Sequence, residues 1–444
     1  MPSRREFLVG TAGLAGATLT AAPARAASAP ERTWQRTYEP AGESTALVHD
    51  LVPLTSGVAL VGTAGEGGDY NGWLGRVDAA GRSQWHELGD GTDSGFLAGA
   101  SAADDGRSVV AAGTTNAGAS PYTPEYSDPY VARVDTSGEL SWRRTYQPAL
   151  PDGGASALTS VADGFVVAGS GGVDGAGRPW VARLDAEGTQ QWTWLHEDGG
   201  TVNAALGVED GVLVAGSTQP VTDDSSPQAR REDAWVARLA DDGRLDWQWR
   251  VDNETGARVE ALAAHPDGGA TAVGRRGFVT ENRGVGWLVA LDSTGSRRWE
   301  RTYPQSTWNW LNDVVAVGDG YLLVGTREEG VETDARGAWL LGVDAEGRVE
   351  WDAQAETGTE GHTALALDDG GVLVAGERES DDGPFGPGWV AKYGGEPAPP
   401  QGEDTTTRGE DTTVSLPSLP GWVGPALTGG VVGALGASAA SRRQ

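Results

Sequence analysis

The sequence predicts an all-β fold, a seven-bladed β-propeller with four strands in each blade. Three observations predict it. A hairpin pattern with an aromatic residue at each end returns along most of the chain, a glycine-ended apolar run precedes each hairpin, and the repeat length is 50 to 57 residues. Repeats of this length with turn glycines at fixed places are typical of propeller blades.

The hairpin pattern is clearest from Trp180 to Trp192, WVARLDAEGTQQW. We expect the Asp185 side chain to fold back on the backbone two residues on, and Gly188 to take the left-handed conformation that a Cβ resists. Each hairpin therefore joins the third and fourth strands of a blade. The same spacing of 12 separates further aromatic pairs: Trp73 and Trp85, Tyr130 and Trp142, Trp235 and Trp247, Trp287 and Trp299, and Trp339 and Trp351.

A second apolar run ends in glycine before each hairpin and predicts the second strand. Upstream of it lies a turn such as Asp163-Gly164, preceded by another short apolar run, so each unit contains four strands. The seven glycines are Gly62, Gly113, Gly169, Gly216, Gly274, Gly325 and Gly376.

The two ends of the repeat array predict a closed ring rather than an open solenoid. The seventh unit stops after its third strand, residues 389–393. Residues 34–38, WQRTY, match the W-x-R-T-Y pattern of the fourth strands at 142–146 and 299–303. We therefore expect the N-terminal strand to complete the last blade, which leaves no open sheet edge.

The hairpin motif D-x-x-G-x-x-x-W resembles the repeats of the quinoprotein-like (PQQ-type) propeller superfamily and of exported bacterial and archaeal propellers. The resemblance covers residues 34–393 and implies a fold more than a function. Enzymes of that superfamily that bind the quinone typically have eight blades, a pair of adjacent cysteines and a calcium site. This chain has seven predicted blades and no cysteine, which disfavours a quinone-dependent dehydrogenase.

The first 26 residues resemble a twin-arginine export signal. Arg4 and Arg5 precede a weakly apolar run, and a small-residue cleavage pattern ends at Ala26. We expect this segment to be removed and residues 27–393 to form the propeller.

The C-terminal segment predicts attachment to the cell surface. Residues 394–419 are rich in proline and threonine and predict a stalk, and residues 420–444 predict a membrane anchor or sorting signal. Pro420, Gly421 and Trp422, an apolar stretch and terminal arginines resemble the archaeal signal cut by an archaeosortase. Asn253 begins the only N-glycosylation sequon.

Composition excludes several classes of function. Acidic residues number 63 against 33 basic ones, so a nucleic-acid binder is excluded. Acidic residues spread over the whole chain resemble the surfaces of halophilic proteins. Without cysteine, there can be no disulfide, thiol nucleophile, iron-sulfur cluster or cysteine-bound zinc.

Five of the seven third strands carry a cation in one register, which leaves two interpretations. The cations could form a ring of basic ligands, or each could pair with a carboxylate of the next strand or blade; the second is favoured because the position alternates with core residues. These residues are Arg76, Arg133, Arg183, Arg238 and Lys392.

Loop lengths predict which face binds a ligand. From the second-strand glycine to the third-strand aromatic the spacing runs 11, 17, 11, 19, 13, 14 and 13, whereas the opposite hairpin keeps one length. On the variable face, Trp308, Asn309, Trp310 and Asn312 lie outside the aromatic register of the repeat. Paired aromatics with amides suit a sugar or another flat ligand, and the alternative is that they plug the central channel.

Two other groups could hold a metal or act as acid and base: His196 with Glu197 and Asp198, and Glu360 with His362. We include His362 among the candidate ligand-binding residues. No nucleophile elbow, phosphate-binding glycine loop or metal-ligand motif of recognised spacing is present in the sequence. We predict no catalytic residue and no cofactor, and leave a bound cation open.

The function favoured by the sequence is a binding or interaction module anchored at the cell surface in a high-salt environment. Its partner would be an envelope component, an extracellular glycan or another small ligand, with membrane contact only through the tail, and we expect a monomer. The alternatives are an extracellular enzyme acting on carbohydrate or peptide, and a passive structural component of the envelope.

Overall fold

The computed structural model describes residues 28–396, except 41–44, 67–68, 89–94, 104–105, 117–126, 147–149, 151–152, 173–176, 219–231, 252–255, 266–267, 278–283, 305–307, 329–335 and 381–385. The export signal with Arg4, Arg5 and Ala26, most of the stalk, the tail with Pro420, Gly421 and Trp422, and the sequon at Asn253 lie outside the described residues. Within the described part, no helix is long and apolar enough to cross a membrane.

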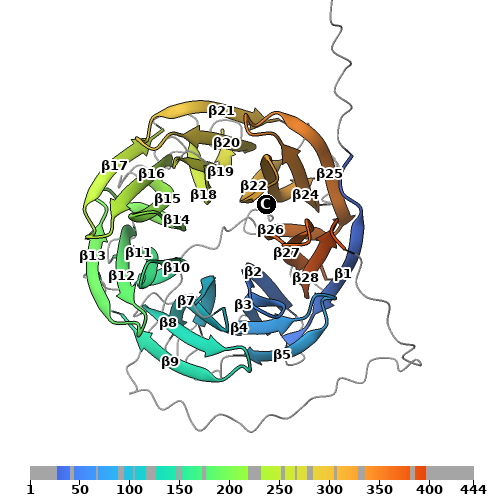
Figure 1. Ribbon diagram of the computed structural model, residues 1–444, viewed down its shortest axis with the longest axis horizontal. Helices are drawn as coiled ribbons and strands as arrows, with labels where there is room; N and C mark the ends of the chain where they lie inside the picture. The colour runs from blue at the N-terminus through green and yellow to red at the C-terminus, as the bar shows by residue number, and fades with distance from the viewer. Residues whose placement is uncertain are drawn as a thin grey trace, which may run out of the picture.

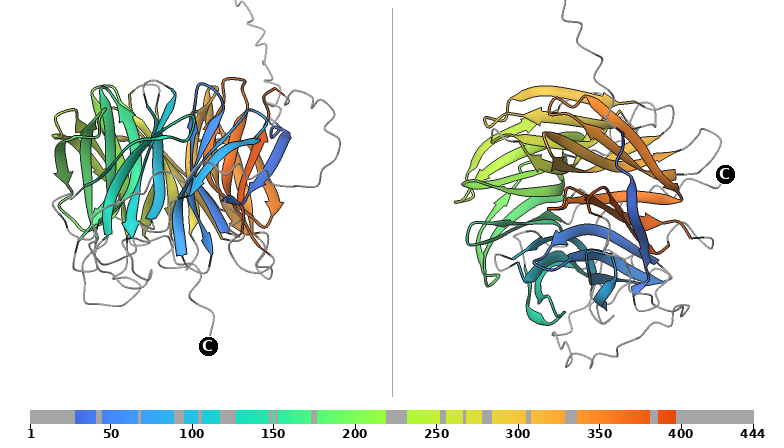
Figure 2. Two further views of the ribbon diagram at one scale, coloured as in Figure 1. Left: turned by 90° about the horizontal axis from the view of Figure 1, so that it is seen from below. Right: turned by 45° about the vertical axis from the view of Figure 1, so that its right-hand side comes forward.

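The described strands form seven four-stranded antiparallel sheets, arranged as blades around one axis (Figures 1 and 2). Blade 1 contains β2 (Thr45–Pro53), β3 (Val58–Glu66), β4 (Asp69–Val77) and β5 (Ser83–Leu88). Blade 2 contains β6 (Gly95–Ala102), β7 (Ser108–Asn116), β8 (Ser127–Asp135) and β9 (Leu140–Thr145). Blade 3 contains β10 (Gly153–Val161), β11 (Gly164–Gly171), β12 (Arg178–Asp185) and β13 (Gln190–Leu195).

The remaining blades repeat the same order. Blade 4 contains β14 (Gly200–Val208), β15 (Gly211–Thr218), β16 (Asp233–Ala240) and β17 (Leu245–Arg250). Blade 5 contains β18 (Ala257–Ala264), β19 (Ala270–Arg276), β20 (Val285–Leu291) and β21 (Arg297–Tyr303). Blade 6 contains β22 (Asn309–Val317), β23 (Gly320–Glu328), β24 (Arg336–Val343) and β25 (Val349–Thr357). Blade 7 contains β26 (Thr359–Ala366), β27 (Val372–Arg378), β28 (Gly388–Tyr393) and β1 (Arg32–Tyr38).

The predicted ring closure is confirmed. The N-terminal strand β1 is the outer strand of blade 7 and pairs antiparallel with β28, with Trp34 opposite Lys392 and Tyr38 opposite Gly388. Figure 1 shows β1 lying against β28 at the place where the ring closes. The predicted architecture of seven four-stranded blades is therefore also confirmed.

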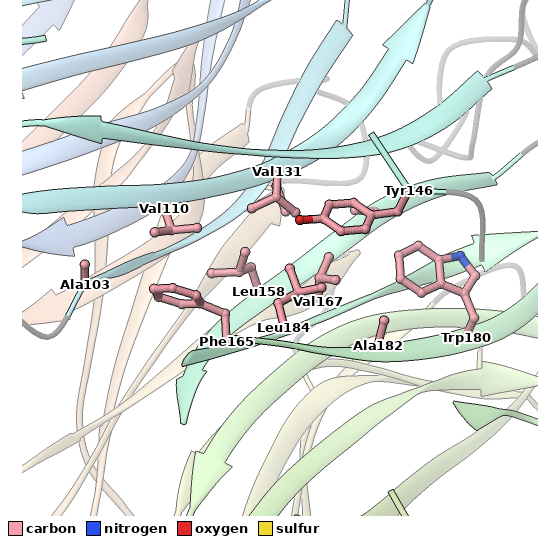
Figure 3. Packing of buried hydrophobic residues seen from close by; sticks show 12 residues of the cluster. Ala103, Val110, Val131, Tyr146, Leu158, Phe165, Val167, Trp180, Ala182 and Leu184 are labelled. Atoms are coloured by element: carbon pink, nitrogen blue, oxygen red, sulfur yellow. The ribbon is translucent and has the colours of Figure 1, made fainter. Parts of the chain in front are cut away.

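The hydrophobic core is divided into seven clusters, and each cluster lies between two neighbouring blades. Figure 3 shows the cluster between blades 2 and 3, where Val110 and Val131 meet Leu158 and Trp180. The first aromatic residue of the repeated hairpin belongs to this core, since Trp180 and Trp235 are fully buried. Burial of such large side chains at every interface is the main force that holds the ring together.

The second part of the repeated motif binds the next blade. In β1, the Arg36 guanidinium donates a hydrogen bond to the carbonyl of Ala80, and the Tyr38 hydroxyl donates to the carbonyl of Gly81 in blade 1. A Cβ on Gly81 would come within 2.7 Å of the Trp34 ring, so this turn requires glycine. The W-x-R-T-Y pattern is thus a contact between blades, and it explains why the N-terminal strand closes the ring.

The predicted hairpin turn is confirmed in detail. The Asp185 carboxylate accepts hydrogen bonds from the backbone N–H groups of Glu187 and Thr189, and Gly188 has a φ of 77°. On the opposite turn between first and second strands, Asp163 takes a positive φ of 58° before Gly164, as a two-residue hairpin requires.

The third-strand cations do not form a ring of ligands. Most of them donate to backbone groups near the turn between the first two strands of their own blade, such as Arg76 to the Ser56 carbonyl and Arg183 to the Ala162 carbonyl. The prediction of a carboxylate in the next strand or blade is therefore mostly wrong. Only Arg238, with Asp246 at 3.7 Å, has a printed ion pair of that kind in the described residues, while Lys392 pairs with Asp369 of its own blade.

Each inner strand contains a β-bulge, which the sequence analysis did not predict. In β22 the pairing with β23 shifts between Leu311 and Asp313, so Asn312 is the extra residue. The bulge brings the Trp310 carbonyl so close to Gly325 that a Cβ there would lie 1.9 Å from it. The bulge is thus the physical reason for the glycine at the end of the second-strand run.

Candidate functional site

The bulges define three equivalent positions in each blade, which we call the inner rim: the residue two before the bulge, the bulge residue, and the second-strand residue that pairs with the first. They lie at the ends of the strands that face the loops of variable length. In order from blade 1 the inner rim is Leu47, His49 and Thr63; Phe96, Ala98 and Thr114; Gly154, Ser156 and Ser170; Thr201, Asn203 and Ser217; Arg258, Glu260 and Arg275; Trp310, Asn312 and Thr326; and Glu360, His362 and Glu377.

The inner rim is chemically asymmetric. Blades 1 to 4 carry apolar, small or neutral polar residues there, apart from His49, whereas blades 5 to 7 carry two arginines, three glutamates, a tryptophan and a histidine. Equivalent backbone positions in a repeat have equivalent packing needs. The departure in blades 5 to 7 therefore marks the part of the rim where side chains do more than hold blades together.

Several bulge residues tie one blade to the next. The Asn203 side chain donates to the Val259 carbonyl and the Asn312 side chain to the Gly361 carbonyl, each over 2.7 Å. In both cases the acceptor is the residue just before the next bulge. Asn312 therefore has a structural partner, although it was a candidate for ligand binding.

Asn309, another candidate, also has a structural role. It is fully buried, and its Oδ1 accepts a hydrogen bond from the backbone N–H of Gly286 in blade 5. A buried amide with such a bond holds two blades together and is not accessible to a ligand.

Trp308 and Trp310 are both half-buried at the entry of blade 6. The Trp308 carbonyl accepts from the backbone N–H of Glu328, and the Arg336 guanidinium lies 5.9 Å from the Trp310 ring centroid. The structure thus places the two aromatic side chains on the inner rim or beside it, with part of each surface exposed. Among the four candidates near β22, these two can contact a ligand.

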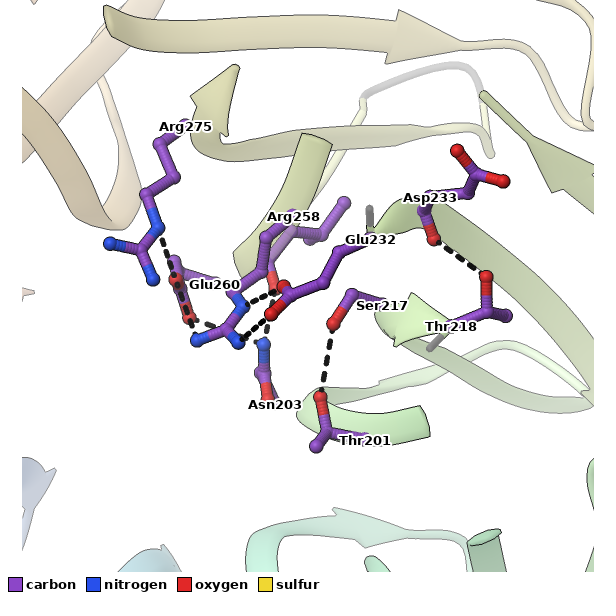
Figure 4. Close-up of polar contacts among 10 residues, drawn as sticks. Thr201, Asn203, Ser217, Thr218, Glu232, Asp233, Arg258, Glu260 and Arg275 are labelled. Atoms are coloured by element: carbon purple, nitrogen blue, oxygen red, sulfur yellow. Dashed lines mark hydrogen bonds and ion pairs between the residues drawn. The ribbon is translucent and has the colours of Figure 1, made fainter. Parts of the chain in front are cut away.

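Blade 5 carries a balanced charge network, shown in Figure 4. Arg258 donates to both carboxylate oxygens of Glu232, each over 2.6 Å, while Glu260 lies 3.9 Å from Arg258 and 3.8 Å from Arg275. Burial would raise the pKa of Glu232, but the charge and hydrogen bonds of Arg258 outweigh it, and the pKa lies below its usual range. Two arginines thus face two glutamates.

Blade 7 carries a cluster that is not balanced. Donor atoms of Glu360, His362 and Glu377 lie within 4.8 Å of one another, and Nε2 of His362 is 4.0 Å from Oε1 of Glu377. Arg336 donates to Oε1 of Glu360 over 2.9 Å. The Glu377 side chain is only 6% exposed, and its Oε2 has no hydrogen-bond partner.

Burial controls the protonation of this cluster. It raises the pKa of Glu377 to about 8, and the nearby Glu360 and Glu379 carboxylates act in the same direction. Burial also lowers the pKa of His362, so this imidazole is neutral and can offer a lone pair. Beside it, the His49 ring is stacked at 6.2 Å, and burial lowers the pKa of His49 to about 3.

The other predicted metal group is not assembled. His196 is buried, and both of its ring nitrogens have protein partners: Nδ1 accepts from the Asp198 backbone at 3.0 Å, and Nε2 lies 2.9 Å from the Gln248 side-chain amide. Its ring packs on Trp235 at 4.8 Å. His196 therefore completes the core between blades 3 and 4, and the Asp198 carboxylate pairs instead with Arg250.

A hollow of about 450 Å³ lies on the outer side of blades 4 and 5, away from the inner rim, and is lined by Trp249, Arg250, Val251, Arg276 and Arg297. Its arginines are already paired. Arg250 bonds to Asp198, and Arg276 and Arg297 bond to Glu300. We therefore place the candidate site at the inner rim.

Sequence analysis found His362 and Glu360 but missed Glu377 and the charged positions of blade 5. A signal was present. The residue after each second-strand glycine is Thr or Ser in five repeats, and the exceptions are Arg275 and Glu377. Comparison of the repeats at this position alone would have identified both.

No protein-family model and no curated protein matches the chain. Solved structures that resemble it include the WD40 β-propeller domain of Doa1, with 14% identity, a TM-score of 0.49 and coverage of 82% of this chain and 98% of that chain. A Dyadobacter fermentans protein of unknown function has 12% identity, a TM-score of 0.49 and the same coverage. The phage phi92 endosialidase has 10% identity and a TM-score of 0.48 over 85% of this chain and 70% of that chain. These likenesses concern the fold alone, and the chain is an all-β, seven-bladed propeller on the evidence of its own blades.

Proposed function

We propose that this chain is a binding module that holds a ligand of the cell envelope on the inner rim of blades 5 to 7. The observation that carries the proposal is the asymmetry of the rim. Blades 5 to 7 place charged and aromatic side chains at positions where most other blades place small or neutral ones.

The chemistry of this half of the rim favours an extracellular glycan or a similar polar, flat ligand. Half-exposed tryptophans offer apolar faces for stacking, and charged groups beside them offer hydrogen bonds of fixed direction. Trp310 beside Arg336 is one such pair, with the Glu360 carboxylate held at 2.9 Å on the other side of the guanidinium.

The proposal includes an address outside the cell. The twin-arginine pattern at Arg4 and Arg5 supports export, and Pro420, Gly421 and Trp422 with the apolar stretch after them support retention at the surface. The net charge of −30 supports a high-salt environment and, with the tail, an archaeal source. A chain ended after Glu396 should be found free in the medium, and its retention on membranes would contradict the anchor.

Binding of purified variants to isolated cell envelopes and to a glycan array tests the ligand site. Trp308→Ala and Trp310→Ala should each weaken binding by about 1 to 3 kcal/mol, the usual contribution of a central aromatic contact. Their melting temperatures should change little because each side chain is only half-buried.

The matched controls are Leu245→Ala and Val349→Ala, which remove exposed apolar side chains near the invariant hairpins on the opposite face. They should leave binding unchanged. If the tryptophan variants instead lose about 3 to 5 kcal/mol of folding free energy and the folded fraction binds normally, the residues fill the core and the site is wrong.

A further inference from the structure

We propose that Glu360, His362 and Glu377 bind one divalent first-row metal ion of the zinc class on the inner rim of blade 7. The inference rests on the proposed binding role of this rim, because a metal held by three protein ligands keeps a coordination position open for a ligand.

The geometry of the three side chains fits such an ion. Their donor atoms lie within 4.8 Å of one another and come from two adjacent strands, β26 and β27, in which Glu360 pairs directly with Glu377. Zinc bonds to nitrogen and oxygen are about 2.0 to 2.2 Å long, which places tetrahedral ligands about 3.4 Å apart. Side-chain rotations that close the cluster by about an ångström are therefore sufficient.

The Glu377 side chain is the observation that points to a ligand. It is 94% buried, since its exposure is 6%, yet its Oε2 has no hydrogen-bond partner. A buried carboxylate without a partner is costly, and native structures rarely keep one without a use. Five other blades place a Thr or Ser at this position, so packing of the blade does not require a carboxylate there.

Blade 5 supplies an internal comparison. There the equivalent position is Arg275, and the two arginines of the network are matched by Glu232 and Glu260. In blade 7 a single guanidinium, Arg336, faces the carboxylates of four glutamates, Glu328, Glu360, Glu377 and Glu379. Blade 7 therefore lacks positive charge at the place where blade 5 has it, and a divalent cation supplies that charge.

Neighbouring groups hold the ligands as they do in metal sites. The His362 ring hydrogen-bonds to the backbone carbonyl of Val48 in blade 1, which leaves Nε2 directed at Glu377. Arg336 fixes the Glu360 carboxylate through Oε1. A ligating histidine and a ligating carboxylate each oriented by a second hydrogen bond are typical of bound metals.

The donor set selects the class of metal. One imidazole with two carboxylates suits zinc, and related ions such as cobalt, whereas calcium and magnesium prefer oxygen ligands alone. The His362 side chain is 20% exposed, which gives an ion access from solvent.

Isothermal titration calorimetry of the full-length chain with Zn²⁺ tests the inference. The protein is freed of metal with EDTA, which is then removed, and the titration is run at high ionic strength to screen the acidic surface. We expect one saturable site per chain. Glu377→Gln and His362→Asn should each weaken it by at least about tenfold, the smallest effect expected even for a group that only supports a ligand.

Glu379→Gln is the matched control because it removes one exposed negative charge from the same neighbourhood. It should change zinc affinity by less than a few fold. Glu377→Thr introduces the residue that other blades carry, so it should fold, give an unchanged near-ultraviolet circular dichroism spectrum and still lose zinc. Co²⁺ bound to the parent should show the intense visible absorption of a tetrahedral site.

Absence of a saturable site in the parent, or equal affinity in the parent and Glu377→Thr, would overturn the inference. So would a loss in Glu379→Gln as large as that in Glu377→Gln. Zinc affinity is measured without any envelope ligand. A parent that binds zinc but no envelope component would therefore contradict the proposed function and leave the metal site standing.

Discussion

Glu232 and Arg258 form an ion pair with side-chain exposures of only 9% and 15%, and each guanidinium bond is 2.6 Å long. Two buried charges of this kind are stabilising only as a pair, because either one alone would stay desolvated. The pair joins the third strand of blade 4 to the inner strand of blade 5. It thus links an inter-blade contact to the inner rim.

Glu232→Gln should lower the free energy of unfolding by about 3 to 5 kcal/mol at neutral pH. Arg258 holds the folded-state pKa of Glu232 below its ordinary value of 4.5, despite the opposing effect of burial. A lowered carboxylate pKa stabilises the fold above the unfolded value and loses this effect as pH falls through the folded one. The difference between parent and variant should therefore shrink below about pH 4.5.

Denaturant unfolding from pH 7 down to the limit of the folded state measures this difference. Glu346→Gln is the control, since Glu346 pairs with Arg348 at exposures of 53% and 64%. Such an exposed pair contributes less than about 1 kcal/mol. A difference for Glu232→Gln that is constant with pH would show that Arg258 does not act through the carboxylate charge.

At the scale of the element, the inner-strand bulge and the second-strand glycine form one device. The bulge turns the carbonyl two residues before it toward the neighbouring strand, and a Cβ on Gly325 would lie only 1.9 Å from the Trp310 carbonyl. The same approach recurs at Gly216, where the Thr201 carbonyl would be 2.0 Å away. Inner-rim side chains are therefore positioned by backbone geometry that only glycine permits.

Gly325→Ala should destabilise the protein by at least about 2 kcal/mol, because a backbone carbonyl cannot give way as a flexible side chain can. It should also weaken zinc binding little, since its own blade holds no metal ligand. Gly75→Ala is the control: it is a strand glycine whose nearest neighbours would lie 3.4 Å from the Cβ, an ordinary contact. Thermal melts of both variants measure this, and equal melting temperatures would contradict the bulge account.

The strands and the ring closure could be predicted from the sequence because their signals are local. Asp185, Gly188 and the paired tryptophans specify a turn within thirteen residues. The bulges could not be predicted, because one extra residue leaves the apolar pattern unchanged. From bulge to glycine the count is 13 for His49 and Gly62 but 15 in the next blade, so register is lost across the variable turn.

The same loss of register explains the outcome for the candidate site. Glu360 and His362 were noticed together because they are adjacent in sequence, whereas Glu377 joins them only through strand pairing. Asn309 and Asn312 were grouped with the tryptophans by proximity along the chain. Their bonds to Gly286 and Gly361 belong to neighbouring blades, and no pattern within blade 6 reveals them.

At the scale of the molecule, seven similar interfaces support a rim that is not uniform. Each interface combines a hydrophobic cluster with a grip of the outer strand on the next turn, and β1 extends this arrangement across the closure. The ring is thereby rigid and repetitive. Chemical variety is concentrated where the inner strands of blades 5 to 7 begin, which is where a rigid scaffold best holds a ligand.

Oxidative footprinting of tryptophan side chains, with the full-length chain free and bound to isolated cell envelopes, tests the claim that this rim is the binding site. Trp308 and Trp310 should be oxidised several-fold more slowly in the bound state. Trp247 and Trp299, which are partly exposed at the hairpin side of the outer strands, should react equally in both states. Protection of Trp247 and Trp299 with no change at Trp308 and Trp310 would contradict the account and move the binding face to the opposite side of the ring.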